Sequence, residues 1–223
     1  PWLWILGIAG FLSFAFVFYA VSETRAANEL RAQVMRVHQG DLGADVQRFQ
    51  ELVARVNGLV LAAGRKDEPT TYVAKKFDPG IFSSQRGLYM RVPFGAAQGA
   101  DSLVQAVLGM DRDAITQCLG ARPSMASELY SKGSFLHADW IAQAEDTDSV
   151  MKLRVIEEEL RQRIERDLPA VREALEARWF MLVLQRGPER RNHPVDVYLW
   201  SLEDYRPLMR GRIQARGVLV AAR

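Results

Sequence analysis

The chain contains one cysteine and three histidines among its 223 residues. The single thiol, Cys118, excludes an internal disulfide and a metal site made of several thiolates, and we interpret it as a small buried side chain. The histidines (His38, His137 and His193) are too far apart in the sequence to form a metal-ligand motif. We therefore predict that the protein binds no metal and no cofactor.

Recognisable catalytic motifs are missing as well. There is no Gly-x-Ser-x-Gly motif, and Gly95–Gly99 lacks the Lys-Ser/Thr pair of a phosphate-binding loop. The acidic run at 157–159 fits a solvated helix face, because arginines follow it at a spacing of four residues. We expect that the protein is not an enzyme, although a site of dispersed residues around His137 or His193 stays open.

Neither basic nor acidic residues are in large excess. The chain has 29 basic and 27 acidic residues, a net charge of +2, so no bulk field favours nucleic acid as a partner. Little cysteine and lysine, with much arginine and alanine, is typical of a GC-rich bacterial genome.

What the sequence does have is a long uncharged run, residues 1–21, at its beginning. As a helix it would extend about 30 Å, the thickness of a bilayer core. We interpret residues 1–22 as a transmembrane anchor, with Trp2, Trp4 and Tyr19 at the two interfaces. A cleaved secretory signal fits less well, because Phe18 would occupy a cleavage position that needs a small residue. A buried helix of a soluble protein is the other alternative.

Small residues gather on this predicted helix, where they would let another transmembrane helix approach closely: Gly7, Ala9, Gly10 and Ser13. Such residues are also ordinary in spanning helices. We expect a single-pass protein of the bacterial inner membrane with a periplasmic C-terminal domain, although Arg25, Arg31 and Arg36 after the run favour a cytoplasmic one.

Residues 23–64 are predicted to form a helical hairpin or stalk. The helical pattern continues from the anchor to Val37, and Gly40–Gly43 then supplies a turn. Apolar residues follow at spacings of three and four: Val46, Phe49, Val53, Val56 and Val60. This stripe would face the preceding helix in an αα-hairpin or pack on the main domain; pairing with another chain is the alternative.

Residues 65–223 are predicted to form an α-rich soluble domain. Helices are expected near 101–108, 111–120, 123–130, 137–144, 147–166 and 167–177, and a short strand at 88–92. Apolar runs at 179–184, 195–202 and 210–220 predict a three-stranded antiparallel meander within 178–220. The fold class is therefore mainly α, of the α+β type, with an N-terminal transmembrane helix, a hairpin stalk and a closing meander.

Residues 178–223 carry nine arginines and four acids, a local net charge of about +5. Arg186, Arg190 and Arg191 cluster in the predicted first turn of the meander, where they could contact lipid headgroups or an acidic partner. A solvated hairpin tip is the simpler interpretation.

Together these observations favour a single-pass, membrane-anchored, non-catalytic subunit that scaffolds, tethers or stabilises a larger membrane protein assembly. Its expected partners are other membrane subunits, through the anchor and the soluble domain, and the lipid bilayer, but not nucleic acid. The alternative is a membrane-anchored sensor or small-ligand-binding module, with the irregular region 72–100 as a pocket wall.

Overall fold

A computed structural model describes residues 2–66, 69–110, 119–121, 123–187 and 194–213, with the backbone alone for residues 2–10. The described chain is mainly helical and has one six-stranded mixed sheet, which confirms the mainly α, α+β class. It divides into two units: Pro1–Gln47 with Phe135–Arg166, and Arg48–Ser134 with Asp167–Arg223.

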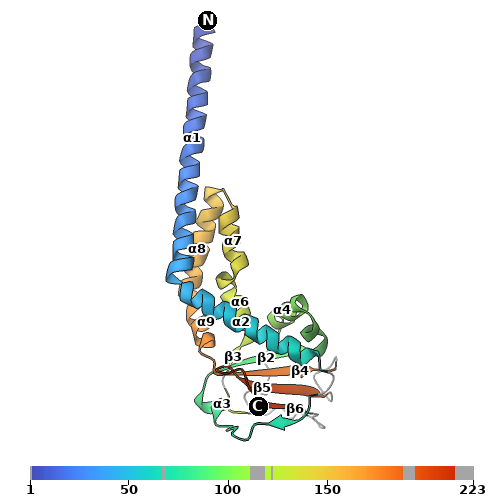
Figure 1. Ribbon diagram of the computed structural model, residues 1–223. Coiled ribbons are helices and arrows are strands. Elements are labelled where there is room, and N and C mark those ends of the chain that lie inside the picture. The colour runs from blue at the N-terminus through green and yellow to red at the C-terminus, as the bar shows by residue number, and fades with distance from the viewer. Residues whose placement is uncertain (1, 67–68, 111–118, 122, 188–193, 214–223) are drawn as a thin grey trace, which may run out of the picture. The chain divides into compact units, whose positions relative to one another are not determined.

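The first unit is built of helices. Its main elements are α1 (Trp2–Arg36), the π-helical turn η1 (Val37–Asp41), α7 (Ala138–Asp146) and α8 (Val150–Arg166). The 3-10 turn η3 (Gly133–Leu136) spans the chain position where the second unit gives way to the first. The second half of α1 packs against α7 and α8 and buries Ala27 and Val34, while α8 buries Leu153 and Leu160 (Figure 1). The predicted continuity of one long helix up to residue 36 is confirmed.

The prediction of a transmembrane helix is contradicted. Within the residues whose side chains the structure describes, no helix is both long and apolar enough to cross a membrane. The described apolar stretch of α1 runs from Phe11 to Val21, and the charges of Glu23 and Arg25 end it. Eleven residues extend about 16 Å as a helix, roughly half of a bilayer core. For this part of the chain, the expectations of a single-pass protein and of an inner-membrane location are wrong.

The helix α2 (Gly43–Gly64) carries the predicted apolar stripe. Phe49, Val53, Val56 and Val60 are buried, and Phe49 packs closely against the backbone at Gly133. These contacts lie within the sheet-containing unit, whereas α1 packs on α7 and α8. The apolar stripe is therefore buried within the sheet-containing unit, and the hairpin or stalk stays a prediction.

The second unit joins the sheet to short helices. Its strands are β1 (Tyr72–Val73), β2 (Gly87–Pro93), β3 (Ser124–Met125), β4 (Trp179–Gln185), β5 (Val195–Ser201) and β6 (Pro207–Ile213). Its helices besides α2 are α3 (Ile81–Ser84), the 3-10 turn η2 (Phe94–Gln98), α4 (Ala100–Leu108), α6 (Ala126–Lys132) and α9 (Leu168–Leu175). Strands at 179–184 and 195–202 were predicted, as was α9 with Pro169 in its first turn, and all are confirmed.

The sheet is not the three-stranded antiparallel meander predicted for residues 178–220. Its order is β1-β6-β5-β4-β2-β3, and β4 pairs with β2 in parallel along its whole length. The antiparallel pairs β4–β5 and β5–β6 are present, but they form only part of a mixed sheet. The physical reason is that the edge of β4 offers a full row of hydrogen-bonding groups, which β2 fills from about ninety residues away.

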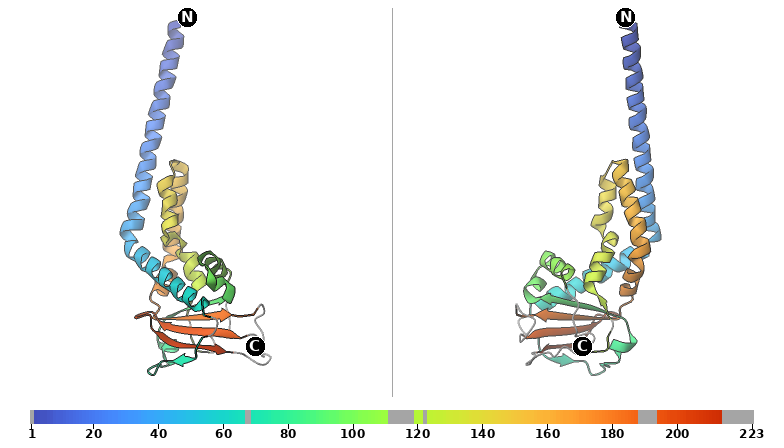
Figure 2. Two further views of the ribbon diagram at one scale, coloured as in Figure 1. Left: turned by 45° about the vertical axis from the view of Figure 1, so that its right-hand side comes forward. Right: turned by 180° about the vertical axis from the view of Figure 1, so that it is seen from behind.

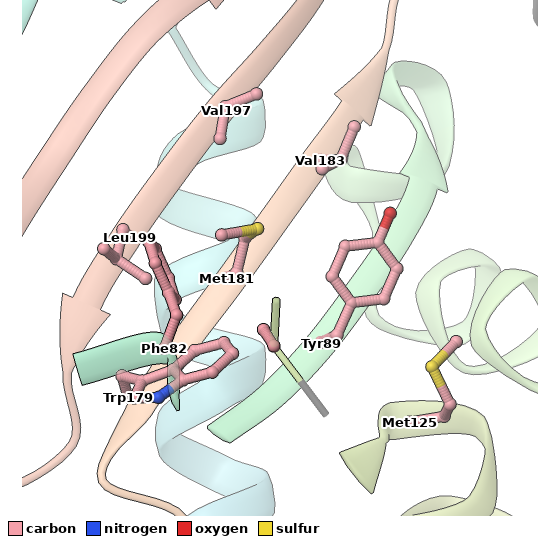
Figure 3. Packing of buried hydrophobic residues seen from close by; sticks show 9 residues of the cluster. Phe82, Tyr89, Met125, Trp179, Met181, Val183, Val197 and Leu199 are labelled. Atoms are coloured by element: carbon pink, nitrogen blue, oxygen red, sulfur yellow. The ribbon is translucent and has the colours of Figure 1, made fainter. Parts of the chain in front are cut away.

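The two faces of this sheet are buried differently. Helices α2, α4 and α6 lie on one side, and α3 lies on the other (Figure 2). On the α3 side the core contains Phe82, Tyr89, Trp179, Met181 and Leu199, whose side chains gather in Figure 3. The Trp179 indole meets Phe82 edge to face and donates from Nε1 to the Gln85 carbonyl across 3.2 Å.

Candidate functional site

The first candidate surface is the apolar segment of α1, residues Phe11–Val21, which we call the apolar segment. All eleven residues are exposed, and the aromatic side chains among them are each 63 to 72% exposed: Phe11, Phe14, Phe16, Phe18 and Tyr19. Eleven residues make three helical turns, so apolar side chains cover the whole circumference. Phe14 and Phe18 stack on each other, one turn apart, with ring centroids 6.4 Å apart.

The predicted helix-packing and interface residues fall partly on this segment. Ser13 and Tyr19 are exposed within it. The backbone at the other predicted positions is helical, but their side chains lie outside the described residues: Trp2, Trp4, Gly7, Ala9 and Gly10.

The second half of α1 differs from the apolar segment, because its polar side chains form hydrogen bonds with α8 and with the turn that precedes it. Arg31 donates to the Thr147 carbonyl across 2.8 Å and to a carboxylate oxygen of Asp148 across 2.9 Å. Gln33 reaches Glu157 on α8. The same helix therefore has a second half held by its own chain and, before it, the exposed apolar segment Phe11–Val21.

A second polar arrangement surrounds Asp196 on β5. Its side chain is fully buried and accepts from two guanidinium groups, with Nε of Arg186 and Nε of Arg212 each 2.7 Å from a carboxylate oxygen. Arg186 also donates to the Lys66 carbonyl and stacks over the Phe94 ring at 3.6 Å. The sequence pattern predicts Asp196 only as part of an apolar run, although one acid inside such a strand, near several arginines, is a signal for a buried ion pair.

Of the three arginines expected to contact lipid or an acidic partner, the structure places one. Arg186 lies inside the chain's own ion cluster with a side chain only 17% exposed. Arg190 and Arg191 lie outside the described residues. A partner contact at this turn stays a prediction.

Next to the cluster, Tyr198 is buried and stacks against Trp200 with the rings 5.4 Å apart. Burial, and secondarily the charge of Asp196, raises the pKa of the Tyr198 phenol. Among the described residues its hydroxyl has no hydrogen-bond partner.

The histidines give no metal centre in the described part of the chain, where no group of three His, Cys, Asp or Glu side chains could hold an ion. His38 is buried in η1, with Nε2 3.0 Å from the Phe135 carbonyl and its ring stacked on Trp140. His137 begins α7 and lies near Asp139. His193 and Cys118 lie outside the described residues.

A cavity of about 280 Å³ opens where β2 and β4 end. It is lined by Arg91, Val92 and Pro93 from β2, by Gln185 from β4, and by Ala106, Gly109 and Met110 at the end of α4. Three of these residues belong to region 72–100, which the sequence singled out as a pocket wall. The others come from distant segments, so periodicity and local motifs could not identify them.

Comparison with protein-family models, with curated proteins and with solved structures found no match.

Proposed function

We propose that this protein is a non-catalytic subunit that tethers or stabilises a larger protein assembly, and that it joins the assembly through the apolar segment of α1. The observation that carries the proposal is the exposure of all eleven residues of that segment. Monomeric proteins rarely expose contiguous apolar patches of more than a few hundred Å².

The free energy gained by burying these aromatic side chains is large enough to support binding. Five aromatic side chains, each about two-thirds exposed, would bury on the order of 100 Å² apiece. At about 25 cal/mol per Å², that area corresponds to roughly 12 kcal/mol, which exceeds most of the range of about 4–15 kcal/mol that association costs. A single contact surface of this kind can therefore hold a subunit in a complex.

The arrangement of the apolar groups indicates the kind of partner. A helix that is apolar on one stripe needs one neighbour, but one that is apolar on every side needs neighbours all round. The expected partner is therefore a set of apolar helices from other subunits that surround Phe11–Val21. The second half of α1, fixed to α7 and α8 through Arg31 and Gln33, would connect that contact rigidly to the rest of its unit.

The experiment compares the full chain with two double variants in the cells that produce it. Phe14→Asp with Phe18→Asp places charges on the apolar segment. Met151→Asp with Val155→Asp is the matched control, because these α8 residues are also apolar, exposed and one turn apart. Complexes are purified, and their mass and subunit ratio are measured by light scattering and quantitative mass spectrometry.

We expect the wild type and the α8 control to purify with other subunits at one fixed ratio, and the α1 variant to purify without them. The proposal fails if the wild type is a stable monomer, or if it forms a homo-oligomer without another chain. It also fails if the wild type floats with phosphatidylcholine vesicles and no protein partner accompanies it, or if both double variants lose the partner equally.

A further inference from the structure

At β1 the sheet has an outer edge, because β1 is the first strand in the order β1-β6-β5-β4-β2-β3 (Figure 1). On its inner side β1 pairs with β6, with Tyr72 opposite Arg210 and Val73 opposite Met209. On its outer side lies no strand that the structure describes. An edge of this kind presents backbone N–H and C=O groups to which a further strand can bond.

The backbone groups of Val73 point to that outer side. The Ala74 N–H donates to the Leu208 carbonyl of β6 across 2.9 Å, so the backbone of Ala74 bonds inward. In an antiparallel pair, residues that bond to the partner strand alternate with residues that do not. Tyr72 therefore also bonds inward, and the N–H and C=O of Val73 between them face outward. An added strand can bond to both of these groups.

The side chains at this edge are apolar and exposed, and the strand is already held in place. Tyr72 is 40% exposed and Val73 is 56% exposed. The guanidinium of Arg210 lies over the Tyr72 ring, 5.6 Å from its centroid, and its Nε donates to the Thr70 carbonyl across 3.0 Å. These contacts keep β1 extended along β6 before any partner binds, which reduces the entropy lost on binding.

The surroundings of the edge are positively charged. Lys75 and Lys76 follow β1 directly and are exposed, and neither forms an ion pair with an acid that the structure describes. The sheet-containing unit, Arg48–Ser134 with Asp167–Arg223, has 21 basic and 15 acidic residues, a net charge of +6. This charge attracts an acidic partner and repels a second copy of the same unit.

We propose that the outer edge of β1 binds an extended acidic segment of a partner protein as an additional strand. Main-chain hydrogen bonds to Val73 hold the segment, its apolar side chains cover Tyr72 and Val73, and its acids face the two lysines. A sugar–phosphate backbone has no N–H to offer to the Val73 carbonyl, so a peptide matches this edge better than nucleic acid does. The inference does not rest on the proposed assembly function, because β1 and the apolar segment belong to different units.

The probe is a fluorescently labelled, end-blocked hexapeptide of alternating glutamate and valine. It is compared with the same peptide N-methylated at every residue, with its lysine–valine counterpart, and with a short oligothymidine. Fluorescence anisotropy on the full chain at low salt measures each dissociation constant. We expect the acidic peptide to bind at least about tenfold more tightly than each of the other three, because only it offers both acids and N–H groups. No binding of the acidic peptide, equal binding of the N-methylated one, or tighter binding of oligothymidine would each overturn the proposal.

Variants of the chain locate the site. Val73→Pro removes the outward N–H and keeps the inward bonds of β1, because proline is accepted at a sheet edge. It is expected to weaken binding of the acidic peptide at least about tenfold. Lys75→Glu with Lys76→Glu should weaken the acidic peptide and favour the basic one. Lys152→Glu with Arg154→Glu makes the same change of charge on the exposed side of α8 and is the matched control, which should bind as the wild type does.

Two results with these variants would show that the peptide binds elsewhere. One is a Val73→Pro chain that unfolds at the same urea concentration as the wild type and binds the acidic peptide as tightly. The other is an equal loss of binding in the two charge variants. If Val73→Pro does not fold, the N-methylated peptide still decides whether main-chain pairing holds the segment.

Discussion

Arg186 and Asp196 form an ion pair whose acidic member is fully buried, with Nε of the arginine 2.7 Å from Oδ2 of the aspartate. Arg212 approaches the other carboxylate oxygen at the same distance. Because Asp196 has no access to water, these two guanidinium groups replace its hydration.

Asp196→Ala should therefore be strongly destabilising. Two partly buried arginines would lose their common counter-charge, and breaking a buried pair from one side costs about 3–5 kcal/mol. Urea unfolding of the full chain measures the loss. Glu203→Ala, which removes an exposed partner of Arg178, is the control and should cost less than about 1 kcal/mol. Equal effects of the two substitutions would show that the Asp196 cluster contributes little.

Removing the Tyr198 hydroxyl should be harmless or favourable. That hydroxyl is buried without a hydrogen-bond partner among the described residues, so Tyr198→Phe removes an uncompensated polar group. Tyr130→Phe is the matched comparison, because the Tyr130 hydroxyl donates to Oδ1 of Asn57 and its loss should cost about 1 kcal/mol. Urea unfolding measures both variants. If Tyr198→Phe lowers the free energy of unfolding as much as Tyr130→Phe does, the prediction is wrong.

Stability should fall on mild acidification because of His38. Burial lowers its pKa below the ordinary value of 6.5, although the hydrogen bond to the Phe135 carbonyl acts in the opposite direction. Above pH 6.5 both the folded and the unfolded chain hold a neutral imidazole. Below it the unfolded chain takes up the proton first, so the free energy of unfolding decreases until the lower folded pKa is passed.

Thermal unfolding between about pH 8 and pH 5 measures this dependence. His38→Gln should flatten the part of the curve just below pH 6.5. A wild-type slope that persists in His38→Gln would assign the acid sensitivity to other groups.

Two glycines should respond in opposite directions to replacement by alanine. At Gly58, inside α2, an added Cβ meets nothing within 4 Å, so Gly58→Ala should stabilise the protein by about 0.5–1 kcal/mol. At Gly87 the same atom would overlap the buried indole of Trp179, so Gly87→Ala should destabilise it by about 1–3 kcal/mol. The midpoints of urea unfolding test both predictions. A Gly87→Ala variant more stable than the wild type would mean that the Trp179 indole can move without a loss of stability.

Several local features could be predicted because neighbouring residues determine them. The apolar stripe Leu153, Ile156 and Leu160 recurs at helical spacing, and α8 follows it. Pro169 interrupts that pattern and suits the first turn of a new helix, which is where α9 begins. The apolar run after Trp179 similarly becomes β4, a strand buried on both faces.

Features that depend on distant contacts could not be predicted in this way. The parallel partner of β4 is β2, and no local pattern indicates pairing between segments about ninety residues apart. The periodicity of the α2 stripe predicts that these side chains are buried, as they are, but it contains no information about which surface covers them. The cavity combines residues from β2, α4 and β4, so it exists only after these segments meet.

By itself, the sequence determined that the longer patterned segments become helices and strands, as in α8, α9, β4 and β5, because side-chain spacing and chain stiffness act over a few residues. It also determined the apolar character of Phe11–Val21, because that depends on composition alone. Only the tertiary structure decided that β2 joins β4, that Asp196 lies between Arg186 and Arg212, and that Arg91 lines a cavity. Those relationships depend on which distant surfaces and charges meet, and the free energy of such contacts is a property of the folded chain as a whole.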